Sequence, residues 1–174
     1  PGDALNALLS APGAVRADGS TGVTDPRGNP SAAVDGSVST TWTAPESDPR
    51  ESKSKAKPEL VIRLPAPQQV QRLRLVMPHD YPARPTRVVV DLGNGKQRRD
   101  VGADGVVDLT PAVTDRISIT ITGASDLIDV NALGFARRAP AGVSEVEITP
   151  APPAGPPDDR IVDIGCDAGV GLKV

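Results

Sequence analysis

The chain has 174 residues and a formal net charge of −3, so no overall positive field points to nucleic acid. Its 19 prolines and 17 glycines disfavour a helical bundle, because helix interiors tolerate neither residue. No apolar run approaches the roughly 18 residues of a membrane span, and the first residues lack the features of a signal peptide. The start on Pro1 suggests a fragment. The single cysteine, Cys166, excludes an internal disulfide and leaves localisation undetermined.

The first predicted element is a short helix over residues 3–9, with three leucines on one face and Pro12 at its end. After it, apolar and polar residues alternate in four segments, which indicates strands with one buried face. These segments are residues 59–64, 72–77, 87–92 and 116–122. Weaker strand patterns cover residues 106–109 and 128–135.

Turn and loop signals separate these strands. Gly93-Asn94-Gly95 is typical of a hairpin turn, whereas Pro65-Ala66-Pro67 predicts a break, because proline cannot donate to a central ladder. Residues 46–59 are almost free of apolar side chains and predict a solvated loop, and residues 78–85, PHDYPARP, predict a compact one. Short strands spaced in this way favour an all-β, antiparallel sandwich or barrel.

The end of the chain predicts a change of domain. Residues 150–160 are rich in proline and predict an extended linker. Residues 161–174 start like a strand but are too few to bury a core, so we expect the start of a following β module or a docked strand. This division leaves residues 1–14 as an N-terminal extension and residues 15–149 as one module.

Three stretches occur in an order that resembles a known family: AVDGSVSTTW (33–42), PELVIRL (58–64) and VQRLRL (70–75). They resemble the discoidin family, the coagulation-factor type C module that is related to galactose-binding-like carbohydrate-binding modules. The family's closing strand is matched by Ser144-Glu145-Val146. The resemblance covers residues 15–149 and implies an antiparallel jelly-roll β-sandwich.

The GVSEVEI ending (142–148), with the proline-rich spacer and the strand bearing Cys166, also resembles the D-type arabinofuranosyltransferases of mycobacteria. These are membrane-embedded glycosyltransferases of cell-wall arabinan assembly. The resemblance implies that the chain is a non-catalytic part of such an enzyme. It would lie outside the cytoplasm, on the periplasmic side of the membrane.

The discoidin resemblance implies a structural calcium ion, which takes about six to eight oxygen ligands. Asp35 and Glu145 would give carboxylates, Thr40 a hydroxyl and a carbonyl, and Gly36 would permit the positive φ that turns carbonyls inward. Backbone carbonyls would come from Ala32, Ser37 and, as a further candidate, Ser144. Many relatives carry Asn or Asp at the place of Ser37. The alternative is that Asp35-Gly36 is only a turn before an ordinary strand.

Trp42, the single tryptophan, is expected in the core rather than on a binding platform. The residues expected to contact a glycan lie in the PHDYPARP loop: His79, Asp80, Tyr81 and Arg84. Arg27 and Asn29 are second choices. Alternatively, Tyr81 covers the edge of the core and His79 is merely solvated.

Several other functions lack their residues. With one histidine and no Gly-x-Ser-x-Gly motif, the chain is not expected to be an enzyme, and Asp158-Asp159 lie in the spacer. The doublets Arg98-Arg99 and Arg137-Arg138 predict solvated strand faces rather than a nucleic-acid site. No loop tip looks rich in large apolar residues, so membrane insertion is not expected.

Two hypotheses therefore remain. In the first, the chain is a calcium-stapled carbohydrate-binding module that binds a cell-wall polysaccharide such as arabinan for a parent glycosyltransferase. In the second, it has the same fold without glycan affinity and serves as a structural or protein-docking module. The loop from His79 to Arg84 discriminates between them.

Overall fold

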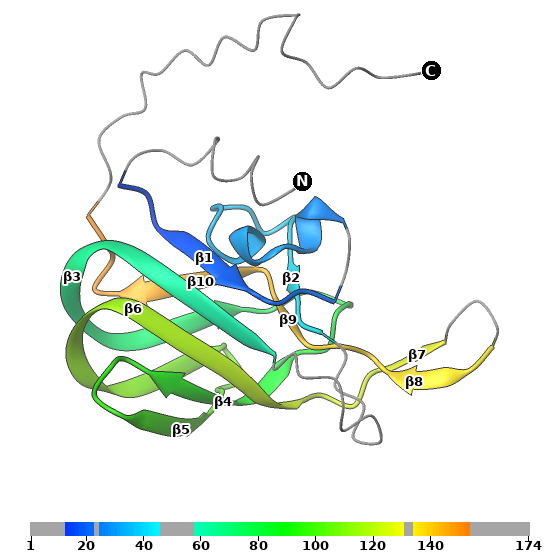
Figure 1. Ribbon diagram of the computed structural model, residues 1–174. Helices are drawn as coiled ribbons and strands as arrows, with labels where there is room; N and C mark the ends of the chain where they lie inside the picture. The colour runs from blue at the N-terminus through cyan, green and yellow to red at the C-terminus, as the bar shows by residue number, and fades with distance from the viewer. Residues whose placement is uncertain (1–12, 23–24, 46–57, 131–133, 154–174) are drawn as a thin grey trace, which may run out of the picture.

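The computed structural model describes residues 13–22, 25–45, 58–130 and 134–153, and these ranges are nearly all strand and loop (Figure 1). The strands are β1 (Arg16–Gly19), β2 (Trp42–Thr43), β3 (Glu59–Val76), β4 (Pro85–Asp91), β5 (Lys96–Asp100), β6 (Val106–Ala124), β7 (Ile128–Val130), β8 (Ala136–Arg138), β9 (Gly142–Val143) and β10 (Glu145–Thr149). Two short 3-10 helices, η1 (Pro26–Gly28) and η2 (Pro30–Ala33), precede β2. The predicted all-β antiparallel fold is confirmed. The helix expected at residues 3–9, residues 46–57 of the expected loop and residues 161–174 lie outside the described residues.

Two long strands, β3 and β6, organise the sandwich (Figure 1). The first part of β3 pairs with β1 and with residues 116–120 of β6, and β4 and β5 extend the sheet beyond β6. The second part of β3 pairs with β10 and with residues 106–114 of β6. Leu60 and Ile62 from the first part share one apolar cluster with Leu73 and Leu75 from the second. The two halves therefore face each other across a common core.

The break predicted at Pro65-Ala66-Pro67 is only partly right. Strand β3 continues through these residues, but its ladder with β6 is interrupted between Arg63 and Gln68. Proline has no N–H to donate, so the ladder cannot continue there even though the backbone stays extended. The interruption separates the half of β3 that pairs with β1 from the half that pairs with β10.

Trp42 is a core residue, as the sequence predicts. Its side chain is 0% exposed, and the indole Nε1–H donates to the carbonyl of Ser20 at 2.9 Å. A buried tryptophan removes about 150–250 Å² from water, and its N–H needs a partner there. The ring therefore fixes the segment around β2 to the core, and with it the loop that precedes β2.

The edge of β6 near Thr110 is covered by side chains rather than by a strand. The Thr110 N–H donates to Gln97 Oε1 at 2.7 Å, and Gln97 Nε2 donates to the Thr110 carbonyl at 3.1 Å. Arg99 Nε donates to the carbonyl of Asp108 at 2.8 Å. These side chains satisfy backbone groups that an open edge would leave unpaired. Of the predicted solvated doublet, Arg98 is exposed but Arg99 is a structural residue.

Candidate functional site

The loop before β2 is closed by one carboxylate. Asp35 Oδ1 accepts from the Ser37 N–H at 2.8 Å, and Asp35 Oδ2 accepts from the Thr40 hydroxyl at 2.7 Å. Gly36 between them has φ +76, which confirms the predicted positive φ. The Asp35 side chain thus holds residues 35–40 together through one hydrogen bond to the backbone and one to the Thr40 hydroxyl.

Glu145, the first residue of β10, meets this loop from more than a hundred residues away. Its Oε2 accepts from the Gly36 N–H at 2.9 Å. Beside it, the hydroxyls of Ser144 and Thr41 are hydrogen-bonded to each other at 2.8 Å. The loop and the closing strand are therefore brought together as the sequence predicts.

The cradle formed by residues 35–40 and Glu145 disfavours the ionised form of Glu145. Burial raises the pKa of Glu145, and the negative charge of Asp35 raises it further, against the opposing hydrogen bond from Gly36. A cation beside Glu145 would favour its ionised form. Among the described residues, no three His, Cys, Asp or Glu side chains converge. Any ion here would need hydroxyl and carbonyl oxygens as well, such as those of Thr40, Ser37 and Ala32, and calcium accepts such a mixed oxygen set.

The four predicted glycan-contacting residues lie together on the surface. His79 Nδ1 and Asp80 Oδ1 are 2.8 Å apart, with side chains 93% and 88% exposed. Arg84 Nη2 donates to the carbonyl of His79 at 3.2 Å, so the loop is curled back on itself. Tyr81 is half-exposed, which agrees with a partial cover over the core edge but leaves ring surface accessible.

This loop, residues 78–84, is fixed to the segments on either side of β7 and β8. The Arg84 N–H donates to Ser125 Oγ at 3.0 Å, and the Ser125 N–H donates back to the Arg84 carbonyl at 2.8 Å. Ala83 donates to the carbonyl of Pro140 at 2.9 Å and accepts from the Gly142 N–H at 3.0 Å. The loop of residues 78–84 therefore rests on a defined backbone frame, which suits it to present side chains in one arrangement.

The hairpin of β7 and β8 is the part of this surface that sequence reasoning missed. It projects from the body of the molecule in Figure 1, and Phe135 at its turn is 67% exposed. Ile128 and Val130 are also exposed. The sequence did not indicate that these apolar side chains are exposed, because alternation in a strand does not tell which face is covered. An available signal was the position of Phe135 directly after Gly134, because glycine is typical of turns.

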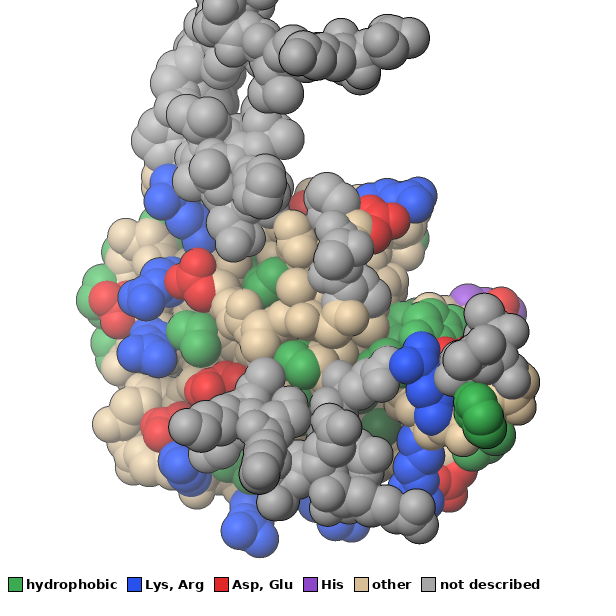
Figure 2. All heavy atoms as spheres, turned by 45° about the vertical axis from the view of Figure 1, so that its right-hand side comes forward, with side chains coloured by type: hydrophobic (Ala, Val, Ile, Leu, Met, Phe, Trp, Pro, Cys, Tyr) green, Lys and Arg blue, Asp and Glu red, His purple; other side chains and the backbone are tan. Residues whose placement is uncertain are grey.

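The basic doublet on the hairpin is paired with acids. Arg137 lies 3.2 Å from Asp129, and Arg138 lies 3.3 Å from Asp126. Figure 2 shows the single histidine of the chain, in purple, on a lobe at one end of the molecule that also carries apolar and basic side chains. The loop is joined to the segments that flank this hairpin by the hydrogen bonds of Ala83 and Arg84.

The two second-choice residues differ in exposure. Arg27 is exposed and pairs with Asp25, with Nη2 and Oδ2 3.0 Å apart, whereas Asn29 is buried. Within the described ranges, no helix is long and apolar enough to cross a membrane.

Comparison with known proteins agrees with this architecture. Residues 12–160 match the family described as "Arabinofuranosyltransferase D, third carbohydrate binding module". The alpha-(1->3)-arabinofuranosyltransferase of Mycobacterium tuberculosis is 38% identical over 97% of the chain, although the chain spans only 12% of that protein.

Solved structures give the same result. The cryo-EM structure of arabinofuranosyltransferase AftD from mycobacteria matches with a TM-score of 0.74 and 38% identity, over 85% of this chain and 11% of that one. A family 32 carbohydrate-binding module from C. perfringens NanJ, solved with galactose, matches with a TM-score of 0.51 over 77% of this chain and 92% of that one. At 15% identity, this likeness shows the discoidin-like fold alone. The chain belongs to the family of the third carbohydrate-binding module of arabinofuranosyltransferase D.

Proposed function

We propose that the chain binds a cell-wall glycan such as arabinan and holds it for a parent arabinofuranosyltransferase on the periplasmic side of the membrane. The observation that carries the proposal is the exposed set His79, Asp80, Tyr81 and Arg84 on its anchored loop. Imidazole, carboxylate and guanidinium groups together can donate to and accept from sugar hydroxyls. The ring of Tyr81 and that of Phe135 offer apolar faces for the C–H side of a sugar.

In this proposal, calcium has a structural role. Asp35 and Glu145 would hold the ion with oxygens from Thr40, Ser37, Ala32 and Ser144. When bound, it would join the loop before β2 to the start of β10 and so stabilise the fold by binding the folded state alone. The ion would take no part in sugar contact, because the loop of residues 78–84, called the recognition loop, supplies none of its ligands.

Titration of the 174-residue chain with a (1→3)-linked arabinofuranosyl oligosaccharide tests the glycan proposal. Tyr81→Ala and Arg84→Ala should each weaken binding by about tenfold or more, which corresponds to about 1.4 kcal/mol. Arg63→Ala, which removes an exposed arginine paired with Asp18 on another strand, should bind like the wild type.

The competing function is a docking module without glycan affinity. Absence of binding to arabinan oligosaccharides and to a broad glycan array would support it against our proposal. So would a Tyr81→Ala variant that binds the oligosaccharide as tightly as the wild type.

The calcium proposal has a separate test. Thermal unfolding in calcium and in chelator should differ for the wild type but not for Asp35→Asn, because the amide lacks the charge that the ion requires. Equal melting temperatures of the wild type in both conditions would refute the site while leaving the glycan proposal intact.

A further inference from the structure

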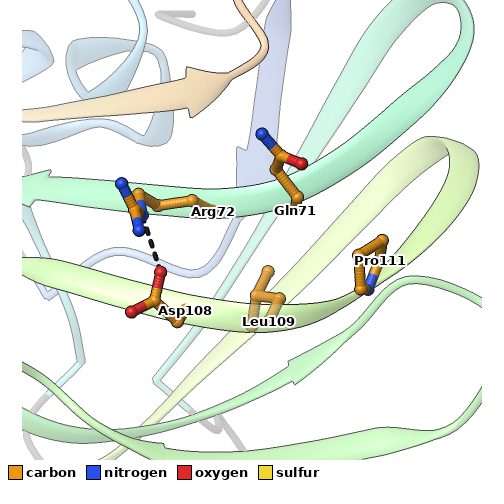
Figure 3. A pocket seen from close by; sticks show the side chains of 5 residues that line it. All are labelled: Gln71, Arg72, Asp108, Leu109 and Pro111. Atoms are coloured by element: carbon orange, nitrogen blue, oxygen red, sulfur yellow. Dashed lines mark hydrogen bonds and ion pairs between the residues drawn. The ribbon is translucent and has the colours of Figure 1, made fainter.

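A second feature with binding chemistry lies on the strand face, apart from both the recognition loop and the calcium cradle. It is a hollow of about 310 Å³ between β3 and β6, lined by Gln71, Arg72, Asp108, Leu109 and Pro111 (Figure 3). This volume is at the lower end of the about 300–1,000 Å³ range of small-molecule sites. It is large enough for a small ligand such as a sugar unit.

The hollow exists because the two strands part at this point. Their ladder pairs Val70 with Ala112 and resumes only at Arg72 with Asp108. Gln71 on β3 therefore faces residues 109–111 of β6 without regular pairing. Pro111 has no N–H to give to a ladder, and the N–H and carbonyl of Thr110 are bonded to Gln97 instead. An irregularity of this kind redirects side chains.

The lining combines donors, acceptors and an apolar surface. Arg72 Nε lies 2.6 Å from Asp108 Oδ1, and the two side chains are 52% and 71% exposed (Figure 3). In the described part of the chain, no hydrogen bond engages the amide of Gln71. Exposed Pro111 supplies apolar surface beside these groups, and Leu109, which is only 8% exposed, lies at the base where the lining meets the core. A sugar hydroxyl both donates and accepts, so neighbouring hydroxyls suit an arginine beside a carboxylate.

Charge balance argues for a neutral ligand rather than an anion. Arg72 is neutralised by Asp108, and the adjacent Arg74 is neutralised by Glu147 at 3.0 Å. A phosphate group entering the hollow would meet the Asp108 carboxylate. Ion pairs this exposed contribute little to folding, so the Arg72–Asp108 pair can rearrange around a ligand at small cost.

We propose that this hollow is a second carbohydrate site, which binds one neutral sugar unit of a glycan independently of the recognition loop. The inference rests on the proposed function for its ligand class, and on the hollow itself for its place and residues. A polysaccharide long enough to reach both sites would bind with greater avidity than a short one.

The test is ¹H–¹⁵N NMR titration of the chain with a (1→3)-linked arabinofuranosyl oligosaccharide. We expect two groups of shifted amides, one at residues 79–84 and one at residues 71–72 and 108–110. The double substitution Arg72→Ala with Asp108→Ala should weaken the second response by about tenfold or more and leave the first unchanged. Gln71→Ala, which leaves the ion pair intact, should weaken the second response as well.

The matched control is Arg74→Ala with Glu147→Ala. It removes an ion pair on the same face, 3.0 Å apart with both side chains 51% exposed, but outside the hollow. It should bind like the wild type at both places. Melting temperatures and circular dichroism of all variants establish that they are folded.

Each result separates this inference from the proposed function. Shifts at residues 79–84 alone would overturn the second site and keep the function. Shifts at the hollow that persist in Tyr81→Ala would support the second site even if the loop failed to respond. A stronger response of the hollow to inorganic phosphate than to the sugar would overturn the neutral-ligand assignment, and no shift anywhere would contradict both proposals.

Discussion

The substitution Glu145→Gln should raise the melting temperature when calcium is absent and lower it, relative to the wild type, when calcium is present. In chelator, we expect Glu145→Gln to melt higher than the wild type at neutral pH. The pKa of Glu145 is raised in the folded protein, chiefly by burial and further by Asp35, so its ionised form is disfavoured there. Glutamine removes the charge but retains an oxygen that can accept from the Gly36 N–H, which Glu145 binds at 2.9 Å.

The sign with pH follows from proton linkage. A carboxyl whose pKa is higher in the folded than in the unfolded state holds more protons when folded, so the free energy of unfolding falls as pH rises. For Glu145 this fall begins near its ordinary value of 4.5 and continues up to the raised pKa. The advantage of Glu145→Gln in chelator should therefore be absent below about pH 4 and present at about pH 7.

In calcium, the wild type should instead melt higher than Glu145→Gln. At about 100 times its dissociation constant, the ion would stabilise the wild type by about 2.7 kcal/mol. For a chain of this length, 1 kcal/mol corresponds to about 2–4 °C, so the wild type should gain roughly 5–11 °C. Glu145→Gln lacks the carboxylate ligand and should gain only a small part of this.

Differential scanning calorimetry in calcium and in chelator measures both effects. Glu147→Gln is the matched control, because Glu147 lies two residues further along β10 and pairs with Arg74 instead of the cradle. It should keep the full calcium response. Equal losses of stability for Glu145→Gln in both conditions would refute the reasoning, since they would show a structural hydrogen bond and no metal.

Three further substitutions test the packing that supports the sites. Trp42→Ala removes a side chain that is 0% exposed and should cost about 3–5 kcal/mol in urea unfolding, whereas a cost below about 1 kcal/mol would contradict its core role. Gly105→Ala should cost clearly more than Gly93→Ala by thermal unfolding. Both glycines have positive φ, which costs alanine about 1–2 kcal/mol, but only at Gly105 would the new methyl group collide with the Leu75 carbonyl. Gln97→Ala should cost about 1–3 kcal/mol and speed amide exchange at Thr110, because it leaves a β6 edge unpaired; unchanged exchange there would disprove that role.

The strands and the contact between the loop of residues 35–40 and Glu145 could be predicted from sequence, because their signals are local or match a family pattern. Alternation located the longer strands, and the Gly36 turn and the single tryptophan indicated the loop geometry and its anchor. The pairing of Glu145 with Gly36 was accessible only through the resemblance, since nothing local joins residues so far apart.

Other features could not be predicted, because they depend on tertiary context. Strand β3 continues through Pro65 as extended backbone, although residues 64–67 have no ladder partner among the described strands. Ile128 and Val130 alternate like core residues but are exposed, because β7 and β8 form a separate two-stranded sheet that no other described strand joins. The sequence does contain one sign of the hollow. Buried apolar residues alternate at Leu73 and Leu75, but Val70 is out of this alternation, and the ladder between β3 and β6 is irregular at the same place.

The most direct test of the glycan-binding account is a crystal structure of the chain grown with calcium and a (1→3)-linked arabinofuranosyl oligosaccharide. The account predicts sugar density against Tyr81 and Arg84, beside Phe135, and an ion between Asp35 and Glu145. A well-ordered recognition loop with no sugar beside it, at a saturating concentration of the oligosaccharide, would contradict the central claim.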